Sequence, residues 1–264
     1  MTVLDDILAG KRDEVTMLRR RDVRDLLQRH AVDASPARGF ADALRRDHLA
    51  VISEIKRRSP SKGDLAPNLD PAATAKAYAS GGAAALSVLT DQVWFGGRID
   101  DLEAARNACE LPVLRKDFII DEVQVFETRA IGADALLLIC AAIPDDVLLA
   151  DLHTLATELG LDVLVEAHDA GEIERALGAG AQIVGVNARD LGTFVEDRSL
   201  SERLAAQIPA DRIAVAESAI RSADDAAAMA GAGFDAVLVG EALVRAEDPS
   251  AMVAAMTAPA RTPR

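Results

Sequence analysis

The stretch Val51-Ile-Ser-Glu-Ile-Lys56 is a short apolar run that ends on a charged side chain. Three later runs end in the same way, at 112–116 with Lys116, at 162–166 with Glu166 and at 212–217 with Glu217. Each run has the length and the apolar content of a strand that is buried on both faces, as strands of a parallel sheet are. The spacing of 50 to 60 residues between the charged ends indicates an internal repeat.

A second series of apolar runs lies between the first four, and each of its members follows a glycine: Gly82, Gly132, Gly180 and Gly233. Alanine-rich segments of helix length separate all of these runs, which is the pattern of repeated βα units. Eight such units predict an α/β fold, a single closed (β/α)8 TIM barrel. Barrels of this kind carry their chemistry at the carboxyl ends of the strands, so we expect the four charged ends to meet at one mouth, as in an enzyme.

The chain is expected to form one domain over residues 1–264, because a single barrel takes about 250 residues. Residues 49–257 would form the barrel, and residues 258–264 a disordered tail. Residues 1–48 would form a helical extension, with helices predicted at 3–20, 22–30 and 40–46. The extension could cap one end of the barrel, or it could lie beside the mouth and shape a substrate site, and the pattern leaves both open.

Composition limits the classes of function. The formal net charge of -14 argues against nucleic acid or an anionic membrane as partner. The longest apolar run, 135–143, is too short to cross a bilayer, and the N-terminus shows no signal-peptide pattern. Cys109 and Cys140 have no metal-ligand spacing and indicate no disulfide framework. We therefore expect a cytoplasmic protein.

The charged strand ends predict acid–base chemistry. Strand periodicity places Ile52, Glu54 and Lys56 on one face, and charges inside a barrel are costly unless they form an ion pair or a site. Lysines and carboxylates brought together there could donate and accept protons, because burial and proximity separate their pKa values. The lysines would also compete with any cation for the carboxylate oxygens, so no metal is expected.

Two turns indicate a binding site for a phosphate group. The seventh strand leads into Ser218 and Ala219, and the eighth ends at Gly240 and Glu241. In barrel enzymes the backbone amides of these two turns commonly bind phosphate. The segment 94–97 joins two aromatic residues to two glycines and could stack on an aromatic substrate, or form a subunit contact. His168 is expected at a helix start, without a catalytic role.

Six motifs together resemble the indole-3-glycerol-phosphate synthase family over essentially the whole chain: Glu54-Ile-Lys-Arg-Arg-Ser-Pro-Ser61, Ser87-Val-Leu-Thr-Asp91 with Phe95-Gly-Gly97, Leu114-Arg-Lys-Asp-Phe-Ile119, Leu164-Val-Glu-Ala-His168, Val186-Asn-Ala-Arg-Asp-Leu191 and Ala216-Glu-Ser218. The resemblance implies a step of tryptophan biosynthesis, the closure of 1-(o-carboxyphenylamino)-1-deoxyribulose 5-phosphate to indole-3-glycerol phosphate with loss of carbon dioxide and water. It implies no cofactor, and a small phosphorylated aromatic molecule as the partner.

The resemblance also implies roles for residues. Lys116 would be the general acid and Glu166 the general base of the later dehydration, with Lys56 sharing proton transfers and holding phosphate or hydroxyl groups. Glu54, Asn187 and Glu217 would orient the lysines and the substrate hydroxyls. The anthranilate part would lie near Ser59, Pro60 and Arg189, with apolar walls from Phe95, Phe118, Leu137 and Leu191. Backbone at Ser218, Ala219, Gly240 and Glu241 would bind phosphate.

Two positions depart from the family pattern: Ala219 stands where glycine is usual, and Ala188 where a polar residue is frequent. Two other functions stay open. A related phosphate-binding barrel such as phosphoribosylanthranilate isomerase would be expected to carry an early cysteine, which this chain lacks. An inactive barrel scaffold would be expected to lose a charged strand end, and none is lost. The sequence leaves open whether the protein is a monomer or a homo-oligomer.

Overall fold

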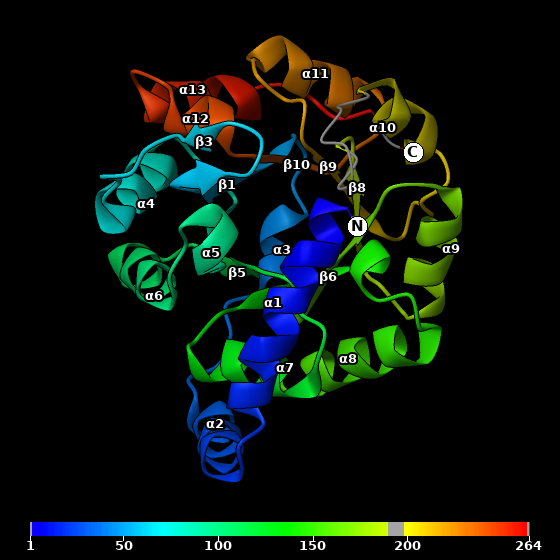
Figure 1. The fold of residues 1–264 in the computed structure, drawn as a ribbon. Coiled ribbons are helices and arrows are strands. Elements are labelled where there is room, and N and C mark those ends of the chain that lie inside the picture. Colours follow the sequence, from blue (N-terminus) through cyan, green and yellow to red (C-terminus); the bar gives the residue numbers. More distant parts are fainter. Residues whose placement is uncertain (1, 190–197, 263) are drawn as a thin grey trace.

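The computed structural model describes residues 2–189, 198–262 and 264, and within these residues eight parallel strands close into a barrel (Figure 1). The strands are β1 (Ala50–Ile55), β4 (Ala85–Leu89), β5 (Val113–Lys116), β6 (Ala135–Ile139), β7 (Asp162–Ala167), β8 (Ile183–Asn187), β9 (Ile213–Glu217) and β10 (Ala236–Val239). Because β1 pairs with both β4 and β10, the sheet has no free edge. The predicted fold class is confirmed.

Helices surround the barrel and follow the strands in sequence: α4 (Pro71–Ser80), α6 (Ile99–Ala108), α7 (Glu122–Ala130), α8 (Asp146–Glu158), α9 (Ala170–Gly178), α10 (Arg198–Ala205), α11 (Ala223–Gly231) and α13 (Pro249–Thr257). Most of them start on a side chain that accepts from the first backbone amides, namely Asp70, Asp121, Asp145, Asp169, Ser222 and Asp248. The glycines that open the second series of strands have positive φ angles, as the ends of these helices require.

Five short elements lie at the barrel ends: strands β2 (Arg58–Ser59) and β3 (Gly63–Asp64), which form a hairpin, helix α5 (Gln92–Phe95), a 3-10 turn (Cys140–Ala142) and helix α12 (Glu241–Val244). The barrel strands themselves are buried almost throughout. Their interior consists mainly of valine, leucine, isoleucine and alanine, as the low aromatic content requires.

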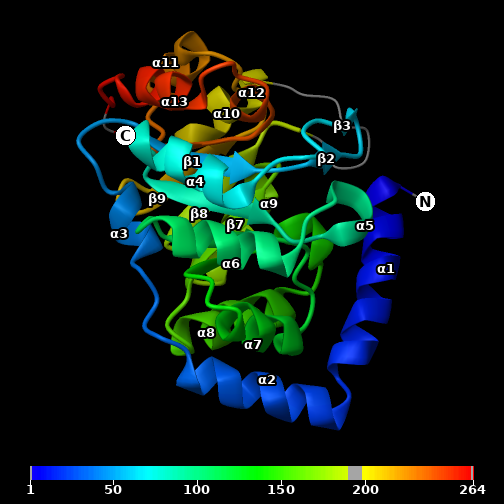
Figure 2. The same ribbon diagram turned by 90° about the vertical axis from the view of Figure 1, so that its left-hand side faces the viewer.

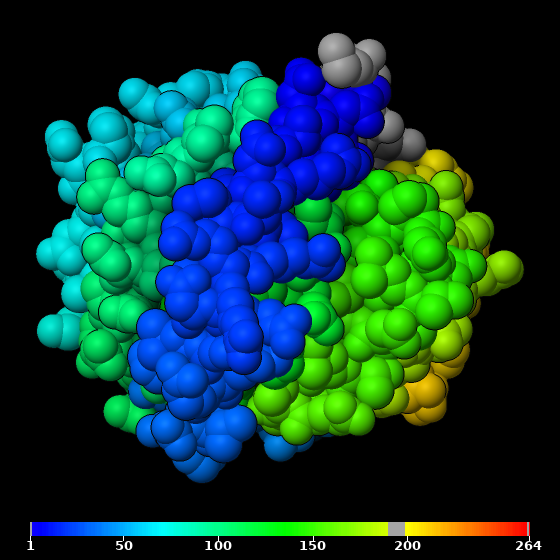
Figure 3. All heavy atoms as spheres, turned by 60° about the horizontal axis from the view of Figure 1, so that its bottom comes forward, coloured from blue at the N-terminus to red at the C-terminus, as the bar shows by residue number. Residues whose placement is uncertain are grey.

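The N-terminal extension forms α1 (Val3–Leu18), α2 (Arg21–Asp33) and α3 (Phe40–Leu44), close to the predicted ranges. Figure 2 shows α1 on the side toward which β1 points and α3 on the opposite side, and Figure 3 shows the extension as one blue band across the barrel surface. The backbone amide of Ala41 donates to Asp162 at the start of β7, at 2.8 Å. Thus α3 covers the amino-terminal end of the barrel, whereas α1 lies beside the mouth.

Residues 258–264 were expected to form a disordered tail, and several of those that the structure describes contact the barrel base. The backbone amide of Leu49 donates to Pro259, and Ala260 forms a bridge with His48. Arg264 pairs with Asp235 at 2.8 Å. Composition alone suggested fraying, but these polar groups find partners on the barrel base.

Candidate active site

The four charged strand ends line one cavity of about 410 Å³ at the mouth of the barrel. Lys56 follows β1, Lys116 ends β5, Glu166 lies near the end of β7 and Glu217 ends β9. The strands are parallel, so their carboxyl ends share one rim, and the period of the sequence repeat brings these groups together.

Glu54 and Lys56 form an ion pair at the end of β1, with 2.7 Å between the Lys56 Nζ and the Glu54 Oε1. Glu54 is buried and Lys56 is partly exposed to the cavity. Gly240 leaves the room for this pair, because a Cβ there would lie 2.3 Å from the Glu54 Oε1 and 3.1 Å from the Lys56 Nζ. A side chain at this turn would therefore displace the ion pair.

Lys116 lies between two buried carboxylates. Its Nζ is 3.1 Å from the Glu166 Oε2 and 3.4 Å from the Glu217 Oε2. Burial alone would lower the pKa of Lys116, but the surrounding carboxyl groups, above all the charged Glu166 and then Glu217 and Glu54, outweigh it and raise the pKa above its ordinary value. Lys116 is therefore an ammonium at neutral pH and can donate a proton.

The two carboxylates differ in charge state. Burial raises the pKa of Glu166, but Lys116, His168 and Asn187 outweigh burial and bring that pKa below its ordinary value. For Glu217, burial dominates and Lys116 offsets only part of it, so the pKa rises to about 8. Glu166 is thus the carboxylate that carries negative charge, and Glu217 holds a proton in the neutral range.

Asn187, at the end of β8, connects the rim. Its Nδ2 donates to the Glu166 Oε1 at 2.9 Å, and its Oδ1 accepts from the Ser218 hydroxyl at 2.7 Å and from the Arg189 backbone amide at 3.0 Å. These contacts fix the orientation of Glu166 relative to the turn after β9. Arg189 also reaches Ser61, with its Nη1 3.4 Å from the Ser61 hydroxyl.

The turn after β9 has an unusual backbone. Ser218 and Ala219 have φ angles of 65° and 57°, both in the left-handed region. Ala219 thus adopts the conformation that glycine usually supplies, at the steric cost of its Cβ. Both residues line the cavity together with Gly240 and Glu241, so the two predicted phosphate turns face the same space.

An aromatic wall lies on the other side of the cavity. The rings of Phe95 and Phe118 are 6.2 Å apart between centroids and tilted by 36°, and Pro60 and Leu137 line the same space. Ser59 does not line the cavity; it is buried and pairs with Gly63 in the β2–β3 hairpin. The predicted wall residue Leu191 lies outside the described residues.

The sequence interpretation missed a contact of His168. This residue precedes α9, as expected, but its Nε2 also lies 3.3 Å from the Glu166 Oε1, and its Nδ1 lies 3.0 Å from the Glu172 Oε2. Burial lowers the pKa of His168, yet the two carboxylates outweigh it and raise the pKa to about 10. The signal was present in the sequence, because His168 follows Glu166 by the strand period of two.

Arg221 was missed as well; it lines the cavity three residues beyond Ser218. A cation so close to the phosphate turn could have been expected from the sequence Ala216-Glu-Ser-Ala-Ile-Arg221.

Among the residues that the structure describes, no cluster of His, Cys, Asp and Glu could hold a metal ion. Within the same part of the chain, no helix is long and apolar enough to cross a membrane.

Solved structures with the same architecture share little sequence with this chain. 3-Hexulose-6-phosphate synthase from Salmonella typhimurium superposes with a TM-score of 0.64 at 16% identity, over 79% of this chain and 97% of that chain. Thiamine phosphate pyrophosphorylase from Pyrococcus furiosus gives a TM-score of 0.60 at 17% identity, over 81% and 95% of the two chains. At these identities the likeness shows the fold alone.

Relatives found by sequence identify the family, which the solved structures do not. The indole-3-glycerol phosphate synthase from Paenarthrobacter aurescens is 50% identical over 255 residues, which cover 94% of this chain and 93% of the relative. The one from Nocardioides sp. is 51% identical over 259 residues, covering 97% and 98%. The family model described as indole-3-glycerol phosphate synthase matches residues 4–256. This chain therefore belongs to the indole-3-glycerol phosphate synthase family.

Proposed function

We propose that the cavity closes the pyrrole ring of 1-(o-carboxyphenylamino)-1-deoxyribulose 5-phosphate, with Lys116 as the general acid. Enzymes of this family are ring-closing, decarboxylating lyases of tryptophan biosynthesis. The assignment of Lys116 rests on the position of its ammonium, which lies between the carboxyl groups of Glu166 and Glu217 inside the cavity. A small phosphorylated substrate is the partner that the family implies.

The cavity supports one orientation of this substrate. The aryl ring would lie against Phe95 and Phe118, where aromatic contact and exclusion of water favour it. The phosphate would lie at the opposite side, at the turns that contain Ala219 and Gly240, near the ammonium of Lys56. The ribulose carbonyl would then lie between the two ends, within reach of Lys116.

Ring closure needs one proton. As the ring carbon attacks the ribulose carbonyl, a carbon–carbon bond forms, and the carbonyl electron pair moves to oxygen, where it takes the proton of Lys116. Loss of carbon dioxide leaves the bonding pair in the ring and restores its aromaticity. The new hydroxyl finally leaves as water with a proton from the Lys56 ammonium, and a base takes the proton that the ring gives up.

Glu166 suits the role of that base. In the free enzyme the Lys116 ammonium is a main reason why the pKa of Glu166 is low. Once Lys116 has donated its proton, this stabilising charge is gone, and Glu166 becomes a stronger base at the point when a base is needed. Asn187 keeps the carboxylate in place meanwhile.

The experiment adds purified protein to the carboxyphenylamino-deoxyribulose phosphate and follows the fluorescence of the indole product. We expect turnover by the wild type and a loss of about 10²- to 10⁴-fold in Lys116→Met, with substrate affinity little changed, because the acid acts mainly in the transition state. Lys76→Met, at an exposed site on α4, is the matched control.

Folded wild-type protein that forms no indole product would contradict the reaction. Turnover of phosphoribosylanthranilate instead would support the isomerase alternative. Absence of turnover with both substrates would favour an inactive scaffold. Normal turnover by Lys116→Met would exclude Lys116 as the general acid but would leave the proposed reaction intact.

We also propose a cytoplasmic location, since Cys109 and Cys140 are both free thiols, as is usual in a reducing compartment.

A further inference from the structure

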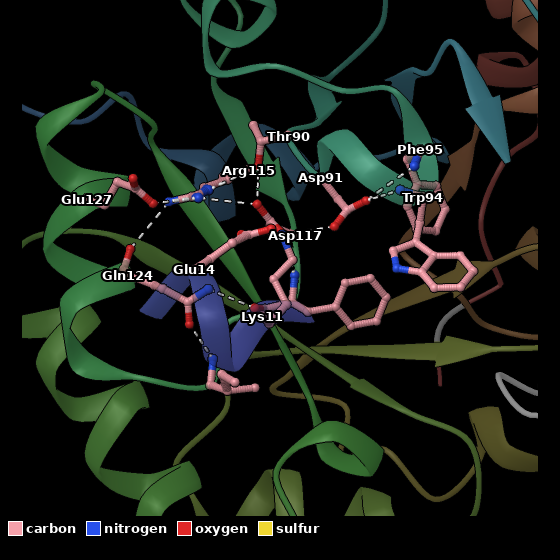
Figure 4. A network of polar contacts seen from close by, with 12 residues as sticks. Lys11, Glu14, Thr90, Asp91, Trp94, Phe95, Arg115, Asp117, Gln124 and Glu127 are labelled. Atoms are coloured by element: carbon pink, nitrogen blue, oxygen red, sulfur yellow. Dashed lines mark hydrogen bonds and ion pairs between the residues drawn. The ribbon is translucent and has the colours of Figure 1, made fainter. Parts of the chain in front are cut away.

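A lysine of the N-terminal extension is buried beside the mouth of the barrel (Figure 4). Lys11 of α1 is only 2% exposed, although lysine is rarely buried unless paired. Its Nζ lies 2.9 Å from the Asp91 Oδ2, 2.8 Å from the Asp117 Oδ1 and 2.9 Å from the Glu14 Oε2. Burial would lower the pKa of Lys11, but Asp117 and Asp91 outweigh it and raise that pKa, so Lys11 stays charged.

Asp91 connects this ammonium to the loop after β4. Its Oδ1 accepts from the backbone amides of Trp94 at 2.7 Å and Phe95 at 3.2 Å, which makes it the N-cap of α5. The cap therefore sets the position of Phe95. Among the described residues, Lys11 is the only ion-pair partner of Asp91.

Asp117 connects the same ammonium to the loop after β5. Its Oδ1 also accepts from the backbone amide of Phe118 at 2.8 Å. Its Oδ2 accepts from the Thr90 hydroxyl at 2.6 Å and from Arg115 at 3.2 Å. Asp117 therefore has a second cation, so the end of β5, including the neighbouring Lys116, keeps an ionic anchor even without Lys11.

We propose that Lys11 is a positioning residue for the aromatic wall, because it joins the two carboxylates that hold Phe95 and Phe118 at their separation. The two rings face the cavity 6.2 Å apart. Helix α1 thus takes part in recognising the aryl group of the substrate, although Lys11 itself does not line the cavity. The aryl recognition rests on the proposed function, whereas the control of α5 by Lys11 does not.

The distribution of partners predicts which kinetic constant changes. Asp91 loses its cation when Lys11 is removed, but Asp117 keeps Arg115. We therefore expect α5 and Phe95 to shift more than the end of β5. Binding of the aryl group then suffers, and the proton transfer by Lys116 is largely retained.

Trp94 offers a direct measurement of α5, because it is the single tryptophan of the chain and its amide is capped by Asp91. The experiment compares wild type, Lys11→Met and the exposed-site control Lys76→Met without substrate. In Lys11→Met we expect a red-shifted Trp94 emission and stronger quenching by acrylamide. The control should match the wild type.

With substrate, Lys11→Met should raise KM by about tenfold and change kcat by no more than about threefold. Lys11→Met combined with Asp91→Asn separates positioning from stability. The second change removes an unpaired buried charge, so it should recover thermal stability but not KM. If Lys11→Met does not fold, Asp91→Asn alone, which keeps the pair of Lys11 with Asp117, should still increase quenching of Trp94.

An unchanged Trp94 signal in folded Lys11→Met would overturn the proposal, as would recovery of KM together with stability in the double variant. The second result would mean that Lys11 only stabilises the fold. Because the fluorescence of the substrate-free protein needs no turnover, its outcome stands even if the proposed reaction proves wrong.

Discussion

Glu166 and Glu217 show how position decides the chemistry of identical side chains. Both are buried and both contact the Lys116 ammonium. Glu166 accepts a hydrogen bond from Asn187 and lies 3.3 Å from the His168 Nε2, and its pKa is lowered. The Glu217 Oε1 accepts no hydrogen bond from the described residues, and the pKa of Glu217 is raised. Two carboxylates on one lysine thus divide into a charged form and a protonated form.

The raised pKa of Glu217 predicts a pH dependence of stability. The folded chain keeps a proton on Glu217 that the unfolded chain releases at about pH 4.5, so the free energy of unfolding falls as the pH rises toward 8. With about 1.4 kcal/mol per pKa unit, partly offset by relaxation, we expect Glu217 to account for a loss on the order of 2 kcal/mol. Urea unfolding of wild type and Glu217→Gln from pH 5 to pH 8 measures it.

Glu217→Gln should be the more stable protein at pH 8, because an amide does not titrate, and the poorer catalyst, because an amide cannot exchange a proton beside Lys116. Glu158→Gln, an exposed site on α8, serves as the control and should follow the wild type. Parallel pH curves for wild type and Glu217→Gln would show that Glu217 does not titrate in this range.

At this scale the sequence predicted the identity of the charged groups but not their charge states. Glu54, Lys56, Lys116, Glu166 and Glu217 stood out because a charge at the end of an apolar run needs a reason. The proton distribution depends on distances of about 3 Å between residues from different strands, which no single run contains. The contact of His168 with Glu166 was missed although the two residues belong to one run and are two positions apart.

At the scale of the element, β8 contributes to the site through Gly185, which has no side chain and leaves room for Glu217. Gly185 pairs with Glu166 in the neighbouring strand β7. A Cβ at this position would lie 2.2 Å from the Glu217 Oε1 and 3.2 Å from the Leu164 Cδ1. Glycine weakens a strand, so its presence here is explained by the space that Glu217 needs.

We expect Gly185→Ala to displace the Glu217 carboxylate from Lys116 and to lower kcat by about 10²-fold, since displacements of about 1 Å can have such effects. The fold should survive, because the nearest atom is the end of a side chain. Gly178→Ala in α9, where an added Cβ meets nothing within 4 Å, is the matched control. A kcat for Gly185→Ala equal to that of the control would contradict this explanation.

The long elements were predictable, and the short ones were not. Barrel strands and outer helices can be recognised in the sequence by apolar runs, capping aspartates and glycines at helix ends. The hairpin of β2 and β3 and the helix α5 contain two to four residues per element, too few for any periodicity to show. Yet α5 positions Phe95, so part of the site rests on the least predictable segment.

At the scale of the molecule, the two ends of the barrel have different tasks. The mouth holds the cavity, where buried polar atoms such as the Glu217 Oε1 accept no hydrogen bond from the described residues. The base holds Asp134, before β6, whose carboxylate accepts from the backbone amides of Arg38 and Val113 and from the guanidinium of Arg106. The sequence repeat predicted the barrel, but the path of the extension from mouth to base depends on contacts such as Lys11 with Asp91, between segments that are remote in sequence.

This division predicts opposite effects of two carboxylate-to-amide changes. Asp134 is completely buried, and its oxygens accept at 2.8 to 2.9 Å from Arg38, Val113 and Arg106. In Asp134→Asn an amide group would face one of these donors and leave it unpaired, so unfolding should become easier by about 2 to 4 kcal/mol. Urea unfolding and kcat, both measured well below the melting temperature, test this.

Turnover of Asp134→Asn should equal that of the wild type, because the base is separated from the cavity by the length of the strands. Glu217→Gln should show the reverse, with higher stability at pH 8 and lower kcat. If Asp134→Asn instead lost turnover while it remained folded, the base and the mouth would be coupled through the strands. The extension, which reaches both ends through α1 and α3, would then be the first connection to examine.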